Sequence, residues 1–364
     1  MTPRGAALGR VLAGVLDADL HLHRHIPDEP AHAGEGVREF RFTRFADALA
    51  AAWSGYEGHD GYDGYDGHVC LCAAGIVVRA IAPLLVSKQV DPAVVVADQD
   101  GRFVVSLLSG HLGGANALAR RVAACTGGQA VITTASDTAG LPALDVLLAE
   151  RGIIPAGHAS LTPLMAALVR GERLGVLDPL GCLDVVADCL ERLTPDTAAA
   201  WSGPVLLVDW RTPGFCGETS QGRAVVAHPP VLALGVGCRR GVPATALESF
   251  VREVLARHGL AAQSLLGLAS IEAKADEPGI LRLAEALGVP AVFYPAADLA
   301  GVPVPTPSAV VLARMGVPSV AEAAAVRLAD ASSLIVPKQI GPGMTCAVAL
   351  RSSCPNIIHP FPPC

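Results

Sequence analysis

The sequence predicts an α/β protein with two α/β end domains, whose sheets are mainly parallel, joined by a small α/β middle domain. Short apolar runs alternate with amphipathic stretches along most of the chain, which is the pattern of strands connected by helices. The composition agrees, because 51% of the residues are hydrophobic while only 4% are aromatic. At 364 residues the chain is long enough for two or three domains.

Composition shifts divide the chain into four segments. We expect an N-terminal α/β domain at 1–138, a middle domain or connector at 139–230, a C-terminal α/β domain at 231–351 and a loose proline-rich tail at 352–364. The Gly/Tyr/Asp repeat at 55–67 is expected to be a flexible surface insertion, because low-complexity sequence cannot pack a core. Its aspartates could bind calcium, although their spacing does not fit an EF-hand loop.

Hydrophobic spacing then predicts the individual elements. In the N-terminal domain we expect helices at 5–16, 45–53, 76–85 and 115–124, and strands at 19–25, 69–73, 93–97, 103–108 and 130–133. No strand precedes the first helix, so we expect either that the true start lies upstream or that the first strand of this domain is missing. The D-Q-D-G sequence before 102 predicts a hairpin turn.

The remaining two domains show the same alternation, more weakly in the middle one. There we expect helices at 144–149 and 163–170 and strands at 174–177 and 205–208. In the C-terminal domain we expect strands at 231–236, 265–271, 291–294, 334–336 and 344–350, and helices at 243–258, 277–287 and 319–328.

The stretch S-G-H-L-G-G-A-N, residues 109–116, is the first candidate site. It joins a predicted strand to a predicted helix, and ligands of open α/β sheets bind beside such turns. Glycines allow close approach to the backbone, and a helix start offers N–H groups to an anion. The candidate residues are Ser109, Gly110, His111, Gly113, Gly114 and Asn116, together with Thr134 and Asp137 of the next polar loop, T-T-A-S-D. A tight turn that only caps a helix is the alternative.

The C-terminal domain supplies a second candidate group of charged residues after three predicted strands. They are Arg239, Arg240, Glu272, Lys274, Asp276, Glu277, Lys338 and Gln339. Such a rim suits a substrate with several carboxylates, because cations anchor it and a carboxylate remains for proton transfer. Surface ion pairs are the alternative. The G-V-G-C-R-R-G turn lacks dinucleotide-site spacing, so we expect no nicotinamide or flavin cofactor.

Several classes of protein are not expected. The net charge of −7 argues against nucleic acid as a partner. The chain shows neither a secretory signal nor a membrane span, so we expect a cytoplasmic protein. Ten cysteines occur without a C-x-x-C pair; we expect Cys70 and Cys72 to be buried thiols and no disulfide framework. His21, His23 and His25 could bind a metal from one strand face, but a solvated edge strand is the preferred interpretation.

The motifs also resemble a known family. R-A-I-A-P-L-L, D-P-A-V-V-V, L-L-S-G-H-L-G-G-A-N-x-L-A-R and V-I-T-T-A-S-D resemble the N-terminal domain of the cobalt-precorrin-5A hydrolase family. G-x-G-C-R-R-G, L-A-S-I-E-x-K-A-D-E-P-G, V-P-S-V-A-E-A-A-A and V-P-K-Q resemble its C-terminal domain. The resemblance covers nearly all of residues 69–350, in the family's order.

This resemblance implies opening of the δ-lactone of cobalt-precorrin-5A, with loss of acetaldehyde, in the anaerobic branch of cobalamin biosynthesis. The substrate is a cobalt tetrapyrrole that brings its own metal, so no protein metal or cofactor is expected, and contacts with other enzymes of the pathway would be transient. We expect His111 to be the acid–base residue, with Glu272, Asp276 or Glu277 as alternatives, and Asn116 or the helix amides to hold an oxyanion.

Arg79, at the start of the first family motif, joins the other candidates as a substrate-binding residue. We also expect the 109–116 loop and the K-A-D-E loop, residues 274–277, to face one cleft between the end domains. Two rival functions stay open: a corrinoid carrier without catalysis, and a serine hydrolase using Ser109 and His111.

Overall fold

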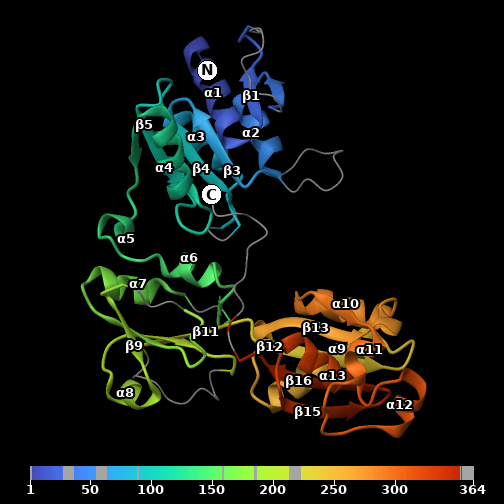
Figure 1. Cartoon of the computed structure of the whole chain (residues 1–364). Helices are drawn as coiled ribbons and strands as arrows, with labels where there is room; N and C mark the ends of the chain where they lie inside the picture. The colour runs from blue at the N-terminus through green and yellow to red at the C-terminus, as the bar shows by residue number, and fades with distance from the viewer. Residues whose placement is uncertain are drawn as a thin grey trace. The chain divides into compact units, whose positions relative to one another are not determined.

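The structure, a computed structural model, describes residues 2–27, 37–54, 64–87, 90–157, 160–183, 187–212, 223–352 and 354. The chain forms two compact units, one within residues 1–146 and one within Leu147–His359 (Figure 1). Several sheets are covered by helices, and eight of the twelve pairs of neighbouring strands in them run parallel. The predicted α/β class is confirmed.

The first unit is built on a four-stranded sheet. Its strands lie in the order β3 (Gly67–Leu71), β4 (Ala93–Ala97), β5 (Phe103–Leu108) and β6 (Gln129–Val131). The predicted hairpin is confirmed, because β4 and β5 are antiparallel neighbours, whereas β3–β4 and β5–β6 are parallel. A separate pair of parallel strands consists of β1 (Leu20–His23) and β2 (Glu39–Phe42).

Helices cover both faces of this sheet, as alternate residues of β4 show. Val95 packs in the cluster with α1 (Pro3–Leu16) and α4 (Ala115–Thr126). Val94 and Val96 pack in the cluster with α2 (Phe45–Ser54) and α3 (Ala74–Ile81). Helix α3 ends before its predicted position at 85, because Pro83 has no N–H with which to continue the helical hydrogen bonds.

The direction of β5 decides where polar loops can meet. Val94, near the start of β4, pairs with Leu108 at the end of β5. The carboxyl ends of β5 and β6 therefore lie at the edge of the sheet where β3 and β4 begin. The carboxyl ends of β3 and β4 lie at the opposite edge.

The middle part of the chain forms a five-stranded sheet in the second unit. Its order is β7 (Ile154–Pro155), β11 (Ala224–His228), β10 (Val205–Val208), β8 (Leu174–Leu177) and β9 (Leu190–Leu193). Its helices are α6 (Leu144–Ala149), which begins in the first unit, α7 (Thr162–Val169) and α8 (Pro195–Ala200). The predicted strands at 174–177 and 205–208 are confirmed, whereas β7, β9, β11 and α8 were not predicted because their patterns are short.

The C-terminal sheet has the order β14 (Ala291–Tyr294), β13 (Leu265–Ile271), β12 (Leu232–Cys238), β16 (Met344–Leu350) and β15 (Leu334–Gly341). One face packs against α9 (Ala244–Arg257) and α10 (Pro278–Leu287). The other packs against α11 (Ala296–Ala300) and α13 (Val320–Ala329), beside α12 (Ala309–Met315). Short 3-10 turns, η3 (Ala262–Ser264) and η4 (Glu272–Lys274), flank β13.

The predicted end of β15 at Val336 is wrong. The strand continues through Pro337 to Gly341. It is an edge strand whose register shifts between Val336 and Gln339, where a proline costs no ladder hydrogen bond. Lys338 and Gln339 therefore lie inside the strand rather than after it.

The cysteines depart from expectation at one pair. Cys182 and Cys354 form a disulfide, with 5.0 Å between their Cα atoms. They are 172 residues apart in sequence, so no local pattern pairs them. Cys70 and Cys72 are free thiols, and burial raises the pKa of Cys70 to about 12. Most of the 55–67 insertion and of the tail lies outside the described residues.

Within the described ranges, no single helix is long and apolar enough to cross a membrane. Taken together, α12 and α13 have the length and apolar composition of a membrane span, but a bend of 75° separates the two helices.

Candidate functional site

The 109–116 loop joins β5 to α4, as the sequence predicts. It folds tightly on itself: the Ser109 carbonyl accepts from Ala115 N–H at 3.1 Å, and the Gly110 carbonyl accepts from Asn116 N–H at 2.9 Å. These are the first two amides of α4. The expectation that the helix start offers N–H groups to an anion does not hold for these two amides, because the loop itself already uses both.

The glycines and one strained serine make this tight path possible. A Cβ on Gly110 would lie 2.8 Å from Asn116 Oδ1, and one on Gly113 would lie 2.4 Å from the Cβ of Ser109. Gly114, at φ +83°, caps α4. Ser109 has φ 57°, a left-handed conformation that costs a non-glycine residue free energy, and its Oγ donates to the Asp91 carbonyl at 2.8 Å. The hydroxyl proton of Ser109 is thus used in a hydrogen bond to the backbone at Asp91.

The two polar loops meet, because β5 and β6 are parallel neighbours. His111 Nε2 lies 3.1 Å from Ser136 Oγ and 3.8 Å from Asp137 Oδ2. Asp137 accepts from Asn116 Nδ2 at 2.8 Å and from Arg120 Nη2 at 2.6 Å. Ser136 and Asp137 lie on the short helix α5 (Ala135–Thr138). We call these five residues the His111 cluster.

Asn116 is oriented as an acceptor rather than as an oxyanion donor. Its Nδ2 donates to both Asp137 and Thr134, the latter at 3.3 Å, so its two protons are used. Its Oδ1 is buried and has no hydrogen-bond partner among the described residues. Both N–H protons of Asn116 are thus already used in this conformation, and its role in holding an oxyanion stays a prediction.

Arg79 is not part of this group. Its Nη1 donates to the Gly75 carbonyl at 2.8 Å, in the first turn of α3. That turn follows β3, so it lies at the edge of the sheet opposite to the His111 cluster.

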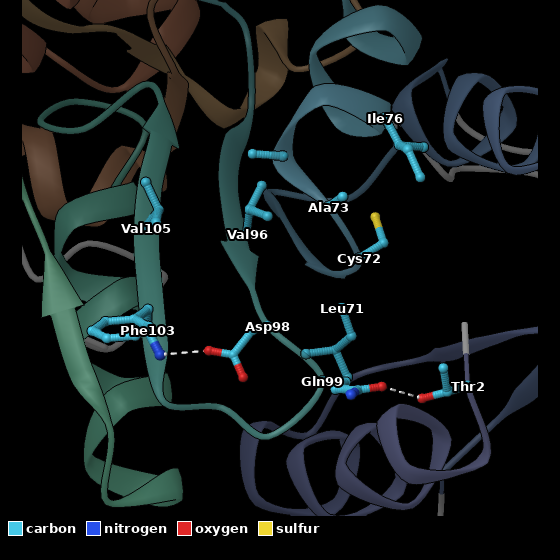
Figure 2. A pocket seen from close by; sticks show the side chains of 11 residues that line it. Thr2, Leu71, Cys72, Ala73, Ile76, Val96, Asp98, Gln99, Phe103 and Val105 are labelled. Atoms are coloured by element: carbon cyan, nitrogen blue, oxygen red, sulfur yellow. Dashed lines mark hydrogen bonds between the residues drawn. The ribbon is translucent and has the colours of Figure 1, made fainter.

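The same opposite edge carries a cavity of about 500 Å³ (Figure 2). Its lining is mostly apolar and includes Leu71, Cys72, Ile76, Val96, Phe103 and Val105. Figure 2 shows the Phe103 N–H donating to Asp98, at 2.7 Å, and Thr2 donating to Gln99, also at 2.7 Å. These bonds occupy polar atoms of the lining, so the cavity offers mainly apolar contact.

The charged residues of the C-terminal domain form two pairs beside β12 and β13. Arg240 binds Asp276 with N–O distances of 3.0 and 3.3 Å, in an exposed pair. Lys274 Nζ lies 3.2 Å from Glu277 Oε2, and their side chains are only 12% and 3% exposed. The Gly241 N–H donates to Glu277 at 2.9 Å. This hydrogen bond, together with the nearby Lys274 ammonium, holds the pKa of Glu277 below its usual range.

Two charged side chains of this group stay available. Glu272 and Arg239 are exposed, and neither side chain has a hydrogen-bond or ion-pair partner in the part of the chain that the structure describes. Lys338 instead donates to the Thr306 carbonyl, and its N–H donates to buried Glu322 at 3.0 Å. Gln339 donates to Pro337 of its own strand at 3.0 Å.

Sequence reasoning missed two members of the His111 cluster. Arg120 lies four residues after Asn116 on α4, a spacing that places both on one helix face. Ser136 lies within the T-T-A-S-D loop that the sequence had already marked. Both could have been found from these positions, had the contact between the loops been known.

No group of three or more metal-binding side chains occurs among the described residues. Strand β1 ends at His23, so His25 lies outside it. His21 Nε2 lies 3.4 Å from Tyr65 Oη, whereas His23 Nε2 lies 3.0 Å from the Thr43 carbonyl, so the two rings do not converge on one point.

Comparison with known proteins gives matches at both ends of the chain. The family described as Cobalamin synthesis G N-terminal matches residues 59–137, and the one described as Cobalamin synthesis G C-terminus matches residues 232–349. The cobalt-precorrin-5A hydrolase of Priestia megaterium is 34% identical over 290 residues, 78% of each chain.

The cobalt-precorrin-5A hydrolase of Salmonella typhimurium is 31% identical over 311 residues, which is 80% of this chain and 79% of that protein. Among solved structures, a putative cobalamin biosynthesis protein G homolog from Sulfolobus solfataricus is 19% identical, with a TM-score of 0.37, and the match covers 96% of this chain and 95% of that one.

Proposed function

This chain belongs to the cobalt-precorrin-5A hydrolase family, and from that membership we propose that it opens the δ-lactone of cobalt-precorrin-5A, releases acetaldehyde and yields cobalt-precorrin-5B. The family membership makes it a hydrolase of cobalamin biosynthesis. The identity of the bonds broken is the proposal.

The observation that supports this chemistry best is the setting of His111. Hydrolysis of a lactone needs a base that removes a proton from the attacking water. The His111 ring is held on its Nε2 side by Ser136 and Asp137, while its side chain stays 23% exposed. A positioned acid–base group of this kind contributes ~10²–10⁴ in rate.

Loss of the two-carbon fragment needs a second proton movement. The proton leaves the hydroxyl oxygen of the fragment, the carbon–carbon bond breaks, and its electron pair passes into the conjugated macrocycle. The sequence offered Glu272, Asp276 and Glu277 as alternative carriers. Since Asp276 and Glu277 are each held by a cation, Glu272 is the carboxylate of the three best able to take this role.

The substrate side chains are carboxylates, which suit the free guanidinium of Arg239. We propose that the cobalt enters with the substrate and that no further cofactor takes part. Contacts with other enzymes of the pathway, a cytoplasmic location and a shared cleft for the two loops stay predictions.

The test is an anaerobic incubation of the purified protein with cobalt-precorrin-5A, following acetaldehyde release and product mass. We expect acetaldehyde and cobalt-precorrin-5B from the wild type, and a fall of ~10²-fold or more in His111→Gln. Asp47→Asn is the control, because it breaks only the exposed ion pair between Arg44, which precedes α2, and Asp47 in the first turn of α2.

Three other outcomes would contradict the proposal in different ways. If His111→Gln keeps full activity and Glu272→Gln loses it, the general base is Glu272 of the C-terminal domain rather than His111. Tight substrate binding without acetaldehyde would favour a corrinoid carrier. Labelling of Ser109 by a covalent serine probe would favour the serine hydrolase, which the bond from Ser109 to Asp91 argues against.

A further inference from the structure

The His111 ring has two nitrogens, and the structure treats them differently. Nε2 faces Ser136 and Asp137, at 3.1 and 3.8 Å. Nδ1 has no partner within the described part of the chain. Only one of these nitrogens is therefore free to meet a substrate.

The neighbours of Nε2 decide which tautomer the neutral ring adopts. The hydroxyl of Ser136 can donate or accept, so by itself it permits both tautomers. The carboxylate of Asp137 can only accept, and its negative charge favours a proton on the nearer nitrogen. Together they favour a protonated Nε2 and leave the lone pair on Nδ1.

Asp137 is fixed in this orientation by two donors. Arg120 binds Oδ1 at 2.6 Å, and Asn116 binds Oδ2, the oxygen nearer to His111, at 2.8 Å. The Asp137 side chain is only 17% exposed, whereas that of Arg120 is 56% exposed. Among the described residues, Asp137 on α5 is the charged side chain that contacts His111, and Arg120 on α4 contacts Asp137.

We propose that Asp137, supported by Arg120 and Ser136, is a positioning residue that makes Nδ1 of His111 the proton-transferring nitrogen. This inference rests on the proposed function. Nδ1 takes a proton from water as the water oxygen bonds to the lactone carbonyl carbon. The ring carbon–oxygen bond then breaks, and Nδ1 returns the proton to the leaving oxygen. One water is consumed, and His111 returns to its neutral form.

The first test observes the tautomer directly. The full chain is labelled with ¹⁵N-histidine, and the His111 signals are assigned from their absence in His111→Gln. We expect pyridine-like Nδ1 and pyrrole-like Nε2 shifts in the wild type. In Asp137→Asn the amide can face Nε2 with its donor, and the preference for this tautomer should be lost.

The second test is kinetic. We expect Asp137→Asn to lower kcat for acetaldehyde release about 10–100-fold, with KM nearly unchanged, by analogy with the residues that orient metal-ligating histidines. Asp47→Asn should leave both constants at their wild-type values. Ser136→Ala keeps the bonds of Asp137 to Asn116 and Arg120, so it should keep the tautomer and lower kcat only a few-fold, and it serves if Asp137→Asn fails to fold.

A protonated Nδ1 in the wild type would overturn the inference, as would an Asp137→Asn variant that matches Asp47→Asn in both tautomer and kcat. If Asp137→Asn loses the tautomer preference as expected but His111→Gln keeps full activity, the catalytic role of His111 is rejected instead. The two failures are therefore distinguishable.

Discussion

Replacing Glu277 with alanine should destabilise the C-terminal domain strongly. The substitution leaves the Lys274 ammonium and the Gly241 N–H without their acceptor, in a place where the Lys274 side chain is only 12% exposed. Removing one partner of a buried ion pair typically costs ~3–5 kcal/mol. Because Lys274 keeps a little solvent contact, we expect about 3 kcal/mol, at the lower end of that range.

Hydrogen exchange measures this change locally, which matters because a chain with several domains need not unfold in two states. A loss of about 3 kcal/mol corresponds to exchange roughly 150-fold faster for the slowest amides of β13 and α10. Asp276→Ala is the matched control, since it breaks the neighbouring but exposed Arg240–Asp276 pair. The control should leave these rates unchanged.

Equal exchange in the Glu277 and Asp276 variants would refute the reasoning. It would mean that the buried Lys274–Glu277 pair contributes no more to the free energy of unfolding than the exposed Arg240–Asp276 pair does. Lys274→Met combined with Glu277→Ala should recover part of the loss, because the unpaired ammonium is removed as well.

The remaining predictions concern pH and packing. Glu277→Gln should reduce the acid sensitivity of β13 and α10 in hydrogen exchange: the pKa of Glu277 is lowered in the folded state, so its stabilisation is present at neutral pH and is lost as the pH falls through that lowered value. Burial lowers the pKa of His68 to about 4, so the free energy of unfolding of the first unit should fall by about 3 kcal/mol as the pH drops from 6.5 to 4. His68→Phe can keep the ring stacked on Trp53 and should remove most of this fall. Thermal unfolding followed by tryptophan fluorescence measures it. Gly113→Ala should distort the 109–116 loop by forcing a Cβ against Ser109, costing ~1–3 kcal/mol in denaturant unfolding, and unchanged stability would contradict the clash.

Much of the fold was predictable from sequence because strands and helices carry their own periodicity. The strands at Leu265–Ile271, Ala291–Tyr294 and Met344–Leu350 lie where the apolar runs predict them. The elements that were missed, such as β7 and α11, are only two and five residues long. So short a segment has too few residues to show a period.

The candidate site was predictable only in part. Polar loops after β5 and β6 were identifiable from their residues, and the family motifs marked the same positions. The sequence alone could not tell that the side-chain N–H protons of Asn116 and the first two amides of α4 already have partners. Hydrogen bonds satisfied within a folded loop depend on its path, which no spacing rule supplies.

The sequence by itself determined the α/β class, the family and the chemical types at each loop, since these follow from local pattern and motif. Tertiary structure alone decided which of those residues meet. The parallel pairing of β6 with β5, two strands separated in sequence by α4, places His111 beside Ser136 and Asp137, whereas Arg79 lies at the opposite edge of the sheet. The turn between β4 and β5 marks a hairpin in the sequence, but no local signal tells which strand β6 joins, because that pairing is made between distant segments.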